Sequence, residues 1–139
     1  MVYLSEQVVS LELAQRLKAL GVEQESMYWW QEDGPGTGHW AILQFPASTF
    51  LSPAGPVELD KTAAFNVSEL GRLWPELARS YRRVDGQWQA EAPLELAEAR
   101  GWGWDEPRHA AGATEADARA ALLIQLIEGS WLRPGEETP

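Results

Sequence analysis

The chain has 139 residues, which is enough for one domain that buries about two-thirds of the surface of its unfolded form. Hydrophobic residues make up 45% of it, a globular composition, and the absence of cysteine excludes disulfides and thiolate metal sites. The net charge of −10 disfavours general nucleic-acid binding, which needs clustered Lys and Arg. The sequence shows neither a signal peptide nor an apolar run that could span a membrane, so we expect a soluble cytoplasmic protein.

The first half of the chain predicts a helix followed by a hairpin. Leucines at helical spacing predict a helix over residues 11–20, with Ser10 as its N-cap. The aromatic-rich segment Glu25–Asp33 predicts a strand, and His39–Phe45 predicts the returning strand after a five-residue glycine-rich loop. Residues 46–64 hold three prolines and little periodicity, so we expect mostly loop there, with room for a short strand near Val57–Leu59.

A second helix and a second hairpin are predicted in the middle of the chain. Asn66 and Glu69 have the spacing of a capping box at a helix start, and Pro75 should end that helix at about Trp74. Further on, Asp85-Gly86 between two short polar–apolar runs is a strong signal for a two-residue hairpin turn.

That two-residue turn has a consequence for the side chains of the second hairpin. In its register Arg83 lies opposite Trp88, which predicts a cation–π pair. Residues 92–113, which follow, look irregular.

The last helix carries the most informative local sequence. Thr114 and Asp117 have the spacing of a capping box, and Gly129 lies where the helix should end. Between these ends nearly every face of the helix carries apolar residues or alanine, so we expect a largely buried helix. The core-facing side should consist of Ala120, Leu123, Ile124 and Ile127.

The predicted order is helix, hairpin, helix, hairpin, helix. Adjacent antiparallel strands with separate helices indicate an α+β fold, and we expect a two-layer sandwich of hairpins with about three helices. We expect one domain over residues 1–133, followed by a flexible C-terminal tail at 134–139.

Four segments in this order resemble a family of small uncharacterised proteins encoded by bacteriophages and prophages. They are Ser10-Leu-Glu-Leu-Ala-Gln-Arg-Leu-Lys-Ala-Leu-Gly21, Met27-Tyr-Trp-Trp30, Ser68-Glu-Leu-Gly-Arg-Leu-Trp-Pro75 and the closing helix Thr114-Glu-Ala-Asp-Ala-Arg-Ala120. The resemblance covers most of the chain except residues 46–64 and 92–112. It implies a phage-type accessory protein and supplies no catalytic residue.

Sequence motifs for chemistry are weak. The loop Gly34–Gly38 lacks the lysine and the following helix of a phosphate-binding loop. His39 and His109 have no second ligand at metal-binding spacing, so we expect no metal site and no cofactor. Nothing selects a catalytic set, which favours a non-enzymatic protein. A hydrolase stays open because acidic residues are abundant, among them Glu32, Asp33 and Asp105.

The eight tryptophans are the unusual part of the composition. Trp102 and Trp104 lie in a glycine-rich stretch, where large exposed rings suit a binding surface. The competing interpretation is that these rings cap the core.

We therefore expect an interaction protein that binds a protein partner, or itself as a homo-oligomer, through an aromatic surface. The alternative is a small-molecule or single-stranded nucleic-acid binder, or a hydrolase, that uses the Trp-rich segment and an arginine cluster. An acidic DNA mimic is a third possibility, although the negative charges do not repeat regularly. Contact with a membrane is not expected, and the net charge disfavours nucleic acid. The candidate binding residues are Trp102, Trp104, Arg79, Arg82, Arg83 and Trp88.

Overall fold

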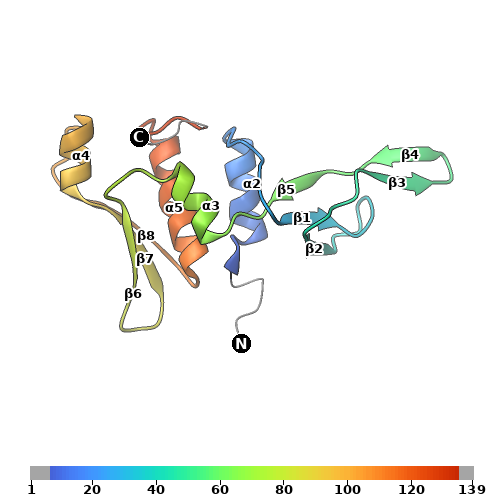
Figure 1. The fold of residues 1–139 in the computed structure, drawn as a ribbon, viewed down its shortest axis with the longest axis horizontal. Coiled ribbons are helices and arrows are strands. Elements are labelled where there is room, and N and C mark those ends of the chain that lie inside the picture. Colours follow the sequence, from blue (N-terminus) through green and yellow to red (C-terminus); the bar gives the residue numbers. More distant parts are fainter. Residues whose placement is uncertain (1–6, 135–139) are drawn as a thin grey trace.

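A computed structural model of the chain describes residues 7–134 (Figure 1). The described part has four helices, namely α2 (Leu11–Ala19), α3 (Val67–Leu73), α4 (Leu94–Arg100) and α5 (Glu115–Glu128). Its strands are β1 (Trp29–Glu32), β2 (Trp40–Leu43), β3 (Thr49–Ser52), β4 (Gly55–Glu58), β5 (Lys61–Ala63), β6 (Arg79–Arg82), β7 (Trp88–Ala92) and β8 (Arg108–Gly112).

The strands form three small antiparallel sheets, ordered β2-β1-β5, β3-β4 and β6-β7-β8. The predicted α+β class is confirmed. The expected two-layer sandwich with three helices is wrong, because the strands are divided among three separate sheets and a fourth helix is present. Of the predicted tail, only Pro134 lies within the described residues.

Helix α5 is the centre of the core. It lies between α2 and α3 on one side and the β6-β7-β8 sheet on the other (Figure 1). Half of its residues are buried, and Ile124 is only 2% exposed, as the apolar pattern predicted. This burial on several sides is why the helix needs alanine and leucine around most of its circumference.

The N-terminus of α5 differs from the predicted capping box. The Thr114 side chain accepts a hydrogen bond from the Asp117 backbone N–H at 3.2 Å, which is the first half of such a box. The Asp117 carboxylate, however, does not return to Thr114. It accepts the backbone N–H of Ser10 at 2.7 Å and so ties the start of α2 to the start of α5.

The first predicted hairpin is confirmed as β1 and β2, in which Glu32 pairs with Trp40. The expectation of mostly loop over residues 46–64 is wrong, because β3, β4 and β5 lie there. The strand expected near Val57–Leu59 is β4, placed two residues earlier. These strands are only three or four residues long, and β4 contains Pro56, which leaves little periodicity for a sequence to show.

The second hairpin has a three-residue turn rather than the predicted two-residue one. The Gly86 N–H donates to the Arg83 carbonyl at 3.0 Å, and Gly86 has a φ of +89°, which is the turn-plus-bulge arrangement of three-residue loops. The register therefore shifts by one residue, and Arg82, not Arg83, lies opposite Trp88. The predicted Arg83–Trp88 pair is wrong for this reason.

Residues 92–113 are regular rather than irregular. Pro93 is the N-cap of α4, and Gly101, with a φ of +69°, ends the helix. The Trp102 N–H donates to the Ala97 carbonyl at 2.9 Å, and the Gly101 N–H to that of Glu98 at 3.1 Å. These two bonds form a Schellman ending. Strand β8 then completes the sheet beside β7.

Candidate interaction surface

The most distinctive surface feature is a hairpin that projects from the body, formed by β3 and β4 (Figure 1). We call this hairpin, residues 49–58, the arm. Its strands pair over four positions from Thr49↔Glu58 to Ser52↔Gly55, and the Ser52 hydroxyl donates to the Gly55 carbonyl at 2.7 Å. Within residues 7–134, neither outer edge of the arm is paired with another strand.

A buried glutamine fixes the base of the arm. Gln31, in the middle strand β1, is 3% exposed. Its Nε2 donates to the Ala47 carbonyl at 2.6 Å, and its Oε1 accepts the Ala47 N–H at 3.0 Å. Both polar groups of the side chain are thus satisfied by one backbone position. The direction in which the chain leaves the sheet is set by this pair of bonds.

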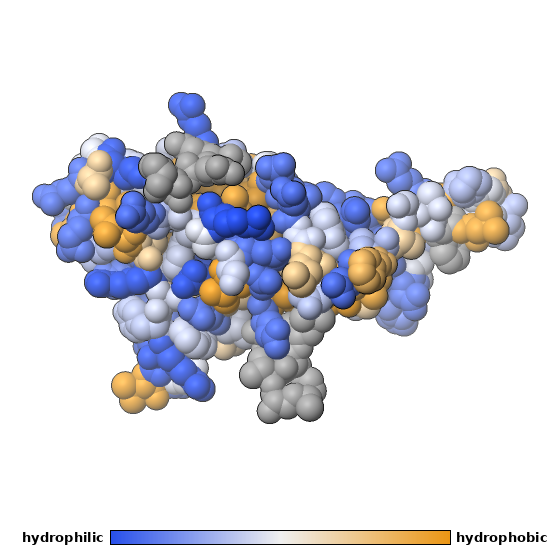
Figure 2. Space-filling model, viewed as in Figure 1, coloured by the Kyte–Doolittle hydropathy of each residue, from blue (hydrophilic) through white to orange (hydrophobic). Residues whose placement is uncertain are grey.

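Several apolar side chains on and near the arm are exposed. Leu51 on β3 is 82% exposed, Val57 on β4 is 38% exposed, and Phe45 just before the arm is 87% exposed. Figure 2 shows apolar residues near the far end of this projection. Isolated exposed leucines are ordinary, but exposed apolar residues on and next to a projecting element make it a candidate contact surface.

The same part of the chain is free of charge. Residues 34–57 contain no Asp, Glu, Lys or Arg, whereas charged residues make up 23% of the whole chain. The segment includes β2, β3 and most of β4. Depletion of charge is the compositional mark of the centre of a protein–protein interface.

A groove of about 480 Å³ lies at the base of the arm, and we call it the arm-base groove. Its apolar lining consists of Trp40, Ala41, Leu43, Phe45, Ala47 and Leu59. Glu32, Asp33 and His39 also line it. Phe45 and Thr49 also line the groove, so it reaches the base of the arm.

Trp102 and Trp104, predicted as binding residues, pack on each other and on Trp131. The ring centroids are 4.9 Å apart for Trp102–Trp104, 5.9 Å for Trp102–Trp131 and 5.4 Å for Trp104–Trp131. The Arg108 guanidinium lies 4.9 Å from the Trp104 ring. All three rings are partly buried and pack against the core. In this arrangement they join the end of α4 to the segment after α5.

The predicted arginine cluster is divided by the strand geometry. Side chains alternate between the faces of a strand, so Arg82 points away from the face that carries Arg79 and Arg83. Arg79 pairs with Glu91 at 3.2 Å, and this hydrogen bond raises the pKa of Arg79. Arg83 pairs with Asp85 at 3.3 Å. Among residues 7–134, Arg82 forms no ion pair.

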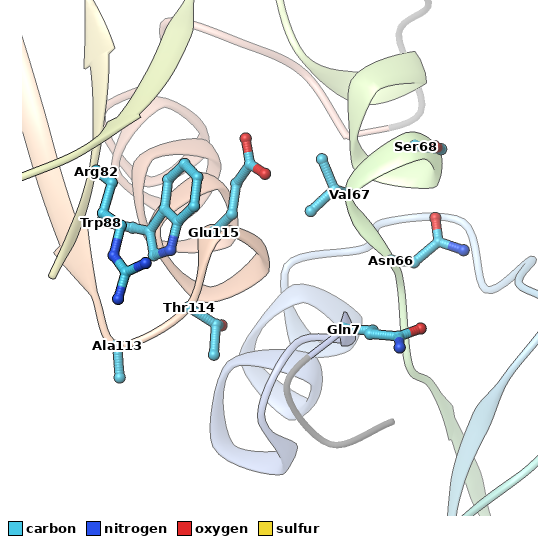
Figure 3. Close-up of a pocket in the computed structure, with 9 residues that line it drawn as sticks. All are labelled: Gln7, Asn66, Val67, Ser68, Arg82, Trp88, Ala113, Thr114 and Glu115. Carbon is cyan, nitrogen blue, oxygen red and sulfur yellow. The ribbon is translucent and has the colours of Figure 1, made fainter. Parts of the chain in front are cut away.

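Arg82 and Trp88 instead line a cavity of about 650 Å³ (Figure 3). They lie on one side of it, and Asn66 and Val67 lie on the other. Glu115 also lines the cavity, but its carboxylate is engaged by the Ser80 hydroxyl at 2.6 Å. The structure thus brings two of the six predicted binding residues together in one cavity.

The arm and its groove were missed by the sequence-based predictions. The uncharged run over residues 34–57 was the signal that could have found them. In the described part of the chain, no helix is both long and apolar enough to cross a membrane. The same residues include no group of three or more His, Asp or Glu side chains placed to hold a metal ion.

No protein-family model, curated protein or solved structure is detectably similar to this chain. The comparisons therefore transfer no functional residue to it, and the site must be judged on its own geometry.

Proposed function

We propose that this chain is a non-enzymatic interaction protein that binds a protein partner, or another copy of itself, through the arm. The observation that carries the proposal is the projecting hairpin, which is uncharged except for Glu58 at its base, with Leu51 82% exposed and both outer strand edges unpaired among residues 7–134. The proposal moves the expected contact from Trp102 and Trp104 to a different apolar surface.

A two-stranded ribbon is marginally stable by itself in water, and unpaired edges invite pairing with another chain. Within residues 7–134 no helix packs over the arm, and its one charged residue is Glu58 at the end of β4, so little charge protects its edges. Gln31 nevertheless holds its base in one position. A positioned but uncovered apolar element is suited to contact a partner.

The biological setting that we propose is that of a phage-type accessory protein acting in the cytoplasm. It rests on the sequence resemblance. The aromatic surface predicted at Trp102 and Trp104 remains a second candidate for contact, because these rings keep partial exposure.

The test compares three tagged proteins in a lysate of the organism that encodes the chain. Leu51→Glu places a charge on the arm, and Val84→Glu is the matched control, because Val84 is fully exposed on the turn of the other hairpin. We expect wild type and Val84→Glu to capture the same protein, or additional copies of the chain, and Leu51→Glu to lose it. Equal capture by all three proteins would contradict the proposal.

A second candidate function is the binding of a small anionic ligand with a flat ring in the cavity beside Arg82. The supporting observation is that Arg82 has no ion-pair partner among the described residues and shares the cavity with Trp88. Arginine recognises carboxylates and phosphates, and an indole ring stacks on flat groups. Titration with nucleoside monophosphates, followed by tryptophan fluorescence in wild type and Arg82→Ala, tests this candidate. No saturable change in wild type would exclude nucleotides of this class.

A further inference from the structure

This inference rests on the proposed function and names the occupant of the arm. We infer that the arm binds a second copy of the same chain. The two β3 strands lie side by side and antiparallel, so that the two Leu51 side chains lie close to the two-fold axis and the turn of each arm lies beside the base of the other.

The two outer edges of the arm differ in their capacity to pair with another strand. Strand β4 contains Pro56, which has no N–H to donate, and proline on an edge strand discourages pairing. Strand β3, Thr49–Ser52, contains no proline, so each of its residues has both a donor and an acceptor. Pairing with another strand is therefore favoured along β3.

Two identical strands that pair antiparallel are related by a two-fold axis, so each contact occurs twice. The base of each β3 then lies beside the tip of the other. Leu51 then lies close to the axis, beside Leu51 of the other copy, and the turn of each arm lies near Phe45 and the arm-base groove of about 480 Å³ in the other copy. The pairing thus places an exposed apolar side chain of each copy at the centre of the contact.

Each copy carries a net charge of −10, so two copies repel each other over most of their surfaces. Contact is tolerated where both sides are neutral, as along β3 and the turn after it, which lie in the uncharged segment 34–57. A basic partner would instead be matched by acidic residues along β3, and the sequence places none there; Glu32 and Asp33 line the groove, and Glu58 ends β4. The neutral β3 edge therefore favours a second copy.

Sedimentation velocity over a concentration series tests the inference with the purified full chain. We expect a wild-type dimer that persists in Val84→Glu and is weakened roughly tenfold or more in Leu51→Glu, as for loss of a central apolar contact. Circular dichroism of each variant checks that the monomer fold is retained. A wild type that is monomeric throughout, or a Leu51→Glu dimer as tight as wild type, overturns the inference.

A crosslink locates the contact independently. Because the chain contains no cysteine, Leu51→Cys introduces a unique thiol close to the proposed two-fold axis. Mild oxidation should give a covalent dimer with Leu51→Cys and none with the control Val84→Cys. Equal crosslinking of both variants contradicts the arrangement.

The outcomes also separate this inference from the proposed function. If the wild type is monomeric and captures another protein that Leu51→Glu does not capture, the proposed function holds and the arm binds that protein instead of a second copy. If Leu51→Glu changes neither capture nor sedimentation, both the proposed function and this inference are wrong.

Discussion

Gln31 and Ala47 are joined by two hydrogen bonds, of 2.6 and 3.0 Å, between one side-chain amide and one backbone position. The amide is buried in the middle strand of its sheet, and the backbone that it holds leads into β3. The position of the arm therefore depends on a side chain outside the arm.

We predict that Gln31→Leu destabilises the protein by about 1–3 kcal/mol, because the N–H and C=O of Ala47 lose their partner. Amide exchange should also become faster in residues 47–59, whose anchor is gone. Urea unfolding and hydrogen exchange measure the two effects. The exposed Gln44→Leu is the control and should change neither, whereas protected amides in the Gln31→Leu arm would contradict the anchoring role.

The tryptophan cluster leads to a prediction about packing. Trp104→Ala should lower the free energy of unfolding by about 3 kcal/mol, because it removes a ring that contacts Trp102, Trp131 and Arg108. The Nε1 of Trp104 is buried without a hydrogen-bond partner among the described residues, so packing holds the ring in place. Denaturant unfolding and sedimentation should be measured together. Unchanged stability with weaker association would return Trp104 to the binding role predicted from sequence.

The Asp117–Ser10 hydrogen bond leads to a prediction about pH. Burial raises the pKa of Asp117, and hydrogen bonds from Ser10 oppose that rise only in part. As pH rises through the ordinary range of aspartate, the unfolded chain loses this proton before the folded chain does. The contribution of Asp117 to stability is therefore greatest in acid and decreases as pH rises through its folded pKa.

Asp117→Asn keeps an oxygen for the Ser10 N–H but cannot ionise. The stability of this variant relative to wild type should therefore increase from about pH 3 to pH 7, the interval that spans the ordinary aspartate pKa. Urea unfolding at several pH values measures the difference. A constant difference over this interval would show that burial does not raise this pKa.

The central helix gives the simplest prediction. Ile124→Ala should cost about 2–5 kcal/mol of stability, because it leaves a cavity beside residues that cannot all relax into it. Ile127→Ala, at a partly buried position of the same helix, should cost less. The denaturant midpoints of the two variants provide the comparison, and equal midpoints would mean that the core does not centre on Ile124.

Much of the secondary structure was predictable because its signals act over a few residues. The capping box of Asn66 and Glu69 forms as expected, and the helix after it ends before Pro75. The apolar pattern of the last helix correctly identified it as buried. The errors also have local causes. Gly86 adopts a positive φ that lengthens the second turn, and short strands within residues 46–64 leave no periodic signal.

The candidate site was much less predictable. Arg82 and Trp88 share a cavity, but Trp102 and Trp104 pack elsewhere, and the arm was not expected. Strand alternation divides an arginine cluster that is contiguous in sequence. Which apolar residues remain exposed also depends on the neighbours that the fold places over them.

By itself, the sequence determined where α2, α3 and α5 form, where two of the three hairpins lie, and which residues fill α5. Caps, turns and helical spacing decide these features within a few positions. Only the tertiary structure decided that Asp117 binds Ser10, 107 residues away, and that Gln31 binds Ala47, 16 residues away. A buried polar group must find a partner, and the nearest partner in space is chosen by the packing of the whole chain.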